Sequence, residues 1–140
     1  MIRTVGDNNL LISGPLWSGP SKRVLAAAVA GQFPLLTSEA LLAELRDALS
    51  DPKLRLRLVA SSTGVEELLE TVRSFSTVVV PAAVVAPQMR DPKDLPVLAA
   101  AVGGGAGLIA TRDKDLLVLK EFQGIGIVTP VELLHTLGLD

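Results

Sequence analysis

The sequence contains no cysteine and one histidine, and aromatic residues make up only 3% of it. Without cysteine there is no disulfide framework and no thiolate zinc site. No apolar run reaches the ~18 residues that a membrane-spanning helix needs; the longest candidate, residues 77–85, is short and contains Pro81. The first residues lack the apolar stretch and cleavage site of a secretory signal. We therefore expect a soluble, cytoplasmic protein with no membrane partner.

The chain also lacks a strong charge of either sign, with a formal net charge of −2. This excludes the broad basic surface of a strong nucleic-acid binder, so any such contact must be local or assisted by a metal. Hydrophobic residues make up 49% of the sequence, which excludes a disordered chain. A length of 140 residues suits one domain, residues 1–140. So apolar a short chain should have a surface to cover, and we expect a homodimer.

Hydrophobic patterning predicts strands that alternate with helices along the whole chain. The predicted strands are 2–6, 33–37, 77–80, 108–111 and 125–128. The predicted helices are 10–14, 21–31 capped by Ser21, 38–49 capped by Ser38, 62–75, 95–102, 115–119 and 131–137, with a loop at 15–20 and a turn at 91–94. Residues 54–58 alternate Leu and Arg, which fits a strand or a helical turn, and we favour the turn. The alternation predicts an α/β fold with a parallel sheet between two layers of helices.

Acidic residues lie where such a fold binds ligands, outside the carboxyl ends of the parallel strands. Asp7 directly follows the first strand, and Asp113 follows the strand 108–111 by two positions. Asp94 opens the helix that leads into that strand, and Glu44 lies inside the helix after the second strand. Carboxylates from separate segments are the oxygen ligands that Mg²⁺ prefers, and a phosphate can complete its shell. The sequence therefore indicates a metal site for phosphoryl chemistry.

Each of these residues also has a purely structural interpretation, and the sequence leaves both open. Asp7 can cap the turn that follows it, and Asp94 can cap the helix that it precedes. Asp113 and Asp115 can be turn and cap residues. Helical periodicity alone does not single out Glu44.

The densest basic stretch offers a second choice between function and structure. Its members are Arg46, Lys53, Arg55 and Arg57. They form either a solvated helix face or a rim that contacts the phosphates of RNA. His135, the only histidine, has no second histidine to share a metal and is expected at the surface or in packing.

Five stretches, in this order and spacing, resemble the PIN-domain family. They are residues 5–13 (VGDNNLLIS), 37–45 (TSEALLAEL), 91–98 (DPKDLPVL), 110–117 (ATRDKDLL) and 127–134 (IVTPVELL). The resemblance is closest to the group described as toxins of toxin–antitoxin pairs. It implies a three-layer α/β/α fold with a central parallel sheet of about four to five strands.

The resemblance also implies an activity, a cofactor and partners. The activity is metal-dependent endoribonuclease cleavage with Mg²⁺ or Mn²⁺, and the partners are RNA, a small antitoxin protein and a second copy of the chain. The residues implied to bind the metal and carry out catalysis are Asp7, Glu44, Asp94 and Asp113. Asn9 and Thr111 would orient ligands or water from behind them, and Asp115 would add a further acidic group.

Two positions depart from the family pattern. Gly6 stands where the family usually has a bulky apolar residue, and we expect it to loosen the strand beside Asp7. Asn8 replaces the usual Thr or Ser. Neither departure removes a carboxylate, so we expect a competent site with altered activity.

Two rival functions remain. A receiver-like signalling domain would need an Asp at the end of the central strand and a Lys at the end of a late one. The strand 77–80, predicted to be buried and central, ends in Pro81, and the last strand ends in Thr129. The second rival is a PIN domain that binds RNA or a partner without cutting.

Overall fold

A computed structural model describes residues 1–16, 19–60, 64–85 and 94–139, with the side chains of 13–16 and 57 left undescribed. The predicted turn at 91–94 therefore lies almost wholly outside the described residues. Among these residues, no helix has the length and apolar composition to cross a membrane.

The centre of the molecule is a sheet with the strand order β3-β2-β1-β4-β6-β5. Its strands are β1 (Thr4–Gly6), β2 (Leu35–Thr37), β3 (Ser76–Val78), β4 (Leu108–Ala110), β5 (Glu121–Phe122) and β6 (Ile125–Val128). Each pairing is parallel except that of β5 with β6. Val5 of β1 pairs with Leu36 on one side and Ile109 on the other, so β1 is a central strand.

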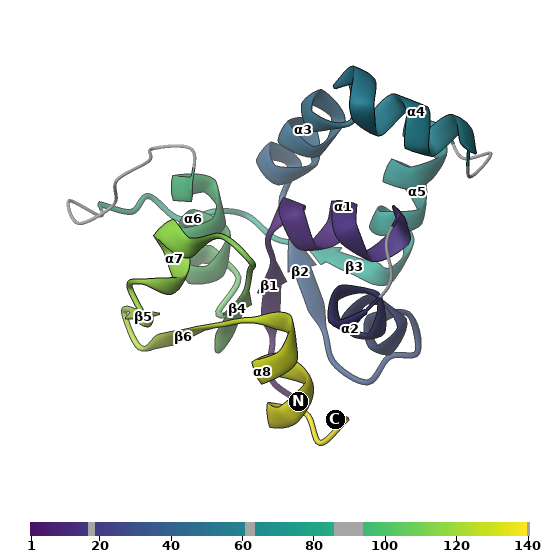
Figure 1. Ribbon diagram of the computed structural model, residues 1–140. Coiled ribbons are helices and arrows are strands. Elements are labelled where there is room, and N and C mark those ends of the chain that lie inside the picture. Colours follow the sequence, from purple (N-terminus) through teal and green to yellow (C-terminus); the bar gives the residue numbers. More distant parts are fainter. Residues whose placement is uncertain (17–18, 61–63, 86–93, 140) are drawn as a thin grey trace.

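Helices cover both faces of this sheet. They are α1 (Asn8–Leu16), α2 (Pro20–Val29), α3 (Glu39–Ala48), α4 (Pro52–Ala60), α5 (Val65–Phe75), α6 (Leu95–Gly103), α7 (Lys114–Leu117) and α8 (Pro130–Thr136). Figure 1 shows α6 and α7 on one side of the strands and α1, α2 and α5 on the other. The predicted three-layer α/β/α fold is confirmed. The sheet of the described residues has six strands and one antiparallel pairing, where a parallel sheet of about four to five strands was predicted.

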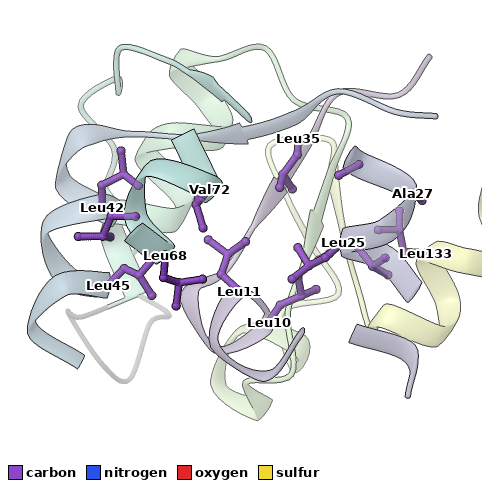
Figure 2. Packing of buried hydrophobic residues seen from close by; sticks show 14 of the residues in the cluster. Leu10, Leu11, Leu25, Ala27, Leu35, Leu42, Leu45, Leu68, Val72 and Leu133 are labelled. Carbon is purple, nitrogen blue, oxygen red and sulfur yellow. The ribbon is translucent and has the colours of Figure 1, made fainter. Parts of the chain in front are cut away.

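Two buried clusters fill the spaces between the layers, because successive strand residues point to opposite faces. Leu36 of β2 packs with α6 and α7, whereas its neighbour Leu35 packs with α1, α2, α3, α5 and α8. In Figure 2, Leu11 of α1 lies toward Leu68 of α5, and Leu10 lies toward Leu25 of α2. Burying each leucine stabilises the fold by roughly 1.5–3 kcal/mol. This packing fixes α1, and with it the residue that precedes the helix, Asp7.

The prediction of a buried central strand at 77–80 is wrong. The strand is β3, at the edge of the sheet, and Val78 and Val80 are 38% and 82% exposed. A β-branched run suits any pleated strand, so composition alone does not separate an edge from a centre. One requirement of the receiver-like signalling domain is now met, because the central strand β1 is followed by Asp7. The Lys that a receiver-like domain needs is still missing, since β6 is followed by Thr129.

Several helix boundaries also differ from the predictions. The helix α1 starts directly after Asp7, because the Asp7 carbonyl accepts from Leu10 N–H. The helix ends at Leu16, inside the segment 15–20 that was expected to be a loop. The helix α2 begins at Pro20 with Gly19 at its N-cap, so Ser21 is not the cap. The predicted cap Ser38 is confirmed, since its hydroxyl oxygen accepts from Leu41 N–H at 3.2 Å.

The remaining differences concern short segments. Residues 54–58 are helical, as favoured, and belong to α4. The strand β5 was not predicted, because two residues are too few to show an alternating pattern. It forms through a tight turn in which Gln123 and Gly124 both have positive φ.

Candidate metal centre

Asp7 lies at the carboxyl edge of the sheet, directly after the central strand. Its backbone N–H donates to the Ala110 carbonyl of β4 at 3.0 Å, and its carbonyl accepts from Leu10 and Leu11 at 3.0 and 3.2 Å. These bonds tie Asp7 to β4 and α1 at once. Its side chain is buried, with 9% of the residue exposed.

Thr111 connects Asp7 to the next acidic residue. The Thr111 hydroxyl donates to Asp7 Oδ2 at 2.7 Å. The Thr111 Oγ1 oxygen also accepts from Asp113 N–H at 3.0 Å. Thr111 is fully buried, so neither bond competes with water. Asn9 closes the same corner more loosely, because its Oδ1 accepts from Arg112 N–H at 3.4 Å. Thr111 is thus bonded to Asp7 and to Asp113, and Asn9 is bonded to the backbone N–H of Arg112; the orienting roles of both residues stay predictions.

Three carboxylates meet beside this corner. Asp94, Asp113 and Asp115 each offer one oxygen, and these oxygens all lie within 4.8 Å of one another. Asp94 precedes α6 and is 8% exposed, whereas Asp113 and Asp115 start α7 and are partly buried. Three anionic groups at such separations repel one another unless a cation lies between them.

The structural interpretations hold for some of these residues and not for others. The Asp113 carboxylate accepts from Asp115 N–H at 2.9 Å and therefore caps α7. The Asp94 side chain makes no capping hydrogen bond to α6. One reason is that Pro96, at the second helical position, has no N–H to donate. Capping therefore accounts for the place of Asp113 and not for that of Asp94.

The electrostatics link Asp7 to Asp113 and Glu44 to Asp7. Burial raises the pKa of Asp7, and the nearby Asp113 carboxylate raises it further, while bonds from Thr111 and the backbone of Asn8 and Asn9 oppose the rise. The pKa of Glu44 is also raised, first by desolvation and then by the negative charges of Asp7 and Asp47.

The four carboxylates predicted to bind the metal therefore lie in one acidic region, but they are not the four that come closest together. Asp115, predicted only as a further acidic group, belongs to the closest cluster, whereas Asp7 and Glu44 lie outside it. The signal for Asp115 was its spacing, because an N-cap Asp and a residue two positions later share one end of a helix. The metal-binding roles of all five residues stay predictions.

The two departures from the family pattern have local explanations. Asn8 Nδ2 donates to the Leu41 carbonyl at 2.8 Å and so holds the first turn of α3, the helix of Glu44, against α1. Gly6 is buried, and a Cβ atom there would lie 2.9 Å from Leu35 Cδ1. The Leu35 side chain thus fills the space of a bulky residue at position 6, and the expected loosening of β1 is not seen.

The ligand chemistry of the cluster fits a hard divalent cation. All the donors are carboxylate oxygens, the type that Mg²⁺ and Mn²⁺ prefer, and the described residues here include no sulfur or imidazole ligand. The carboxylates also come from separate elements, so the fold rather than one loop sets their spacing.

The basic stretch is only partly available to a ligand. Both nitrogens of the Arg46 fork bind the Glu66 carboxylate at 3.0 Å, so its charge is already paired. Lys53 and Arg55 lie exposed on α4, and the side chain of Arg57 is outside the described residues. The phosphate-contacting rim stays a prediction that rests on Lys53 and Arg55. His135 is exposed on α8.

Comparison with known families finds one match. The sequence model of the PIN domain matches residues 3–115, which include Asp7, Glu44, Asp94, Asp113 and Asp115. The match ends before β6, so the similarity predicted for residues 127–134 lies outside it. No curated protein matches the chain.

Proposed function

The chain belongs to the PIN-domain family, and we propose that it is a metal-dependent endoribonuclease that acts as the toxin of a toxin–antitoxin pair. PIN domains are generally metal-dependent nucleases. The observation that carries the proposal is the cluster of Asp94, Asp113 and Asp115, whose carboxylate oxygens lie within 4.8 Å of one another beside the buried Asp7.

Each acidic residue has a part in the proposed reaction. Asp94, Asp113 and Asp115 would hold Mg²⁺ or Mn²⁺, with Asp7 and Glu44 on the adjoining side. A bound ion polarises a phosphoryl oxygen and lowers the pKa of an attacking water. The carboxylates alone would repel a phosphodiester, so the cation also makes the site accessible to an anionic substrate.

Asp7 suits the removal of a proton from the attacking water. Burial raises its pKa toward the range in which a carboxylate accepts a proton readily, which is what general base catalysis requires. The Thr111 hydroxyl holds Oδ2, and this bond fixes the plane of the carboxylate. We infer that Thr111 is a positioning residue and that Asp7 contacts the reacting water.

Cleavage of matched oligonucleotides tests the nuclease activity. Single-stranded RNA and DNA of one sequence are incubated with Mn²⁺, with Mg²⁺ and with EDTA. We expect RNA cleavage that needs the metal and is lost in the double variant Asp94→Asn/Asp113→Asn. Asp51→Asn is a matched control, because Asp51 is an exposed cap on α4 and Asn caps equally well. Cleavage that survives EDTA or the double variant would refute the proposal, and RNA binding without cleavage would favour the non-catalytic rival.

The toxin role needs its own test. Expression of the chain in a bacterial host should arrest growth, and the double variant should not. Co-expression of the neighbouring reading frame should relieve the arrest if it encodes the antitoxin. Normal growth with an active nuclease would leave the enzyme in place and remove the toxin assignment.

A further inference from the structure

A cavity of about 350 Å³ is lined in part by Arg112, the residue that directly precedes Asp113. Its lining residues are Pro20, Ser21, Arg112, Leu117, Thr129, Pro130 and Val131. They come from the start of α2, the loop between β4 and α7, α7 itself, and the start of α8. Because Arg112 and Asp113 are neighbours in the chain, the cavity and the carboxylate cluster contain adjacent residues. None of the lining residues is acidic.

The start of α2 has backbone N–H donors that find no acceptor among the described residues. Within a helix the first N–H groups have no acceptor, and here the N-cap Gly19 has no side chain to supply one. Pro20 has no N–H, which leaves those of Ser21 and Lys22. The start of α8 differs, because Thr129 and Glu132 form a capping box there.

Ser21 adds a side-chain hydrogen-bonding group to the cavity. The residue is 5% exposed and lines the cavity. No hydrogen bond of its hydroxyl is found within the described part of the chain. The Ser21 oxygen is not among the fully buried atoms without a partner, so it is accessible from the cavity and can donate to a ligand there.

Arg112 supplies the charge. It is exposed and forms no ion pair with the described residues. Its backbone is fixed by Asn9, while its guanidinium is available. A guanidinium offers paired N–H donors that match two phosphate oxygens.

We propose that this cavity binds a phosphate group of a single-stranded nucleic acid, the one next along the strand from the phosphate at the metal centre. The Arg112 guanidinium, the Ser21 hydroxyl and the first N–H groups of α2 are its donors. The proposal rests on the proposed nuclease function for its substrate. It assigns the direction of the strand, from the carboxylate cluster over Arg112 toward the start of α2.

The test is the binding of a fluorescein-labelled single-stranded RNA, measured by anisotropy in EDTA so that no metal contributes. Arg112→Ala should weaken binding about tenfold and lower the slope of log affinity against log salt by about 0.7. Arg112→Lys should recover part of the affinity. Arg3→Ala is the matched control, because Arg3 lies at the opposite edge of the sheet, where its Nε donates to Gly104 O.

Ser21→Ala separates a ligand role from a structural one. Since the hydroxyl makes no bond with the described residues, its removal should leave the melting temperature equal or higher while RNA binding weakens several-fold. A purely structural Ser21 would give a lower melting temperature and unchanged binding. Inorganic phosphate, titrated in place of RNA, should bind at least about tenfold more weakly; equal affinity would overturn the nucleic-acid assignment.

The outcomes distinguish this proposal from the nuclease proposal. No RNA binding in EDTA, or binding by Arg112→Ala with the affinity and salt slope of the parent, would overturn the cavity even if the parent cleaves RNA. Binding that depends on Arg112 in a parent that never cleaves would keep the cavity and refute the nuclease.

Discussion

Asp7 is the residue on which the structure and the proposed chemistry depend together. It ends the central strand, begins α1 and is bonded to Thr111. Asp7→Asn should keep these bonds and the fold, while RNA cleavage falls by at least about a hundredfold, because a charge near the cation and the base for the water are both removed. Gel assays with Mn²⁺ measure the change, with Asp51→Asn as the control. Unchanged cleavage would leave Asp7 with only its capping role.

The stability of Asp7→Asn should depend on pH. Because burial raises the pKa of Asp7, the folded chain binds this proton more tightly than the unfolded chain does. The stability that Asp7 gives to the metal-free protein is fully present below the ordinary value of 3.8 and is lost as the pH rises through the raised pKa.

At neutral pH in EDTA, Asp7→Asn should therefore melt at an equal or slightly higher temperature than the parent, and this advantage should vanish in acid. Melting curves of both proteins across the acidic range measure it. A variant that loses stability at neutral pH would show that the Asp7 carboxylate stabilises the fold.

Thr111 should matter through its hydroxyl. Thr111→Val keeps the shape but breaks the bonds to Asp7 Oδ2 and Asp113 N–H, which should cost about 1–3 kcal/mol of unfolding free energy. Mn²⁺ affinity should fall too, because the carboxylate is no longer held. Thr111→Ser should restore both in calorimetry, and failure of this rescue would mean that the methyl group matters instead.

Part of this site could be predicted from sequence at the level of single residues. Asp7 and Asp113 follow strands, and the rule for parallel sheets brings such residues to one edge. Which carboxylates come closest could not be predicted, since that depends on helix packing and on the turn into α7. Glu44 shows the limit, because its helix pattern fits several orientations and only the resemblance selected it.

At the scale of elements, periodicity located most helices and strands but not their places in the sheet. The segment 77–80 is more apolar than β1, yet β1 is central and β3 lies at the edge. Strand order depends on which helices cover each strand, and no single segment carries that information. β1 contains Thr4 and Gly6, and it becomes central because β2 and β4 pair with it on both sides.

One crossing between elements sets a strict requirement for glycine. Residues 80–82 pass directly over the end of α6, and a Cβ atom on Gly103 would lie 2.1 Å from the Val80 carbonyl oxygen. Gly103→Ala should therefore lower the unfolding free energy by at least about 3 kcal/mol, because backbone rather than a flexible side chain must move. Gly64→Ala is the control, since a Cβ there meets nothing within 4 Å, and urea unfolding compares the two. Equal stabilities would contradict this crossing.

At the scale of the whole molecule, acidic and basic side chains lie at different places on the surface. The carboxylates gather at one edge of the sheet, Arg112 lies next to them, and the chain remains close to neutral overall. We therefore expect RNA binding to depend on a few local contacts. The slope of log affinity against log salt should be shallow, because it is proportional to the number of phosphate contacts.

The surface between α2 and α5 is where we expect a second copy of the chain. A groove of about 250 Å³ is lined almost wholly by apolar atoms there, and Val29 beside it is 63% exposed. Lys22 lines the groove from α2, and Leu68, Thr71, Val72 and Phe75 line it from α5. A two-fold axis would place α2 of one copy against α5 of the other and cover the groove.

The homodimer prediction is tested by light scattering at micromolar concentration. The parent should have the mass of a dimer, and Val29→Glu should have that of a monomer, because it buries an unpaired charge in an apolar interface. Val59→Glu is the matched control, since Val59 is 76% exposed on α4, away from the groove. A monomeric parent would refute the dimer. A dimer broken by Val59→Glu and not by Val29→Glu would move the interface to α4, and both variants must keep the helical circular dichroism of the parent for either result to count.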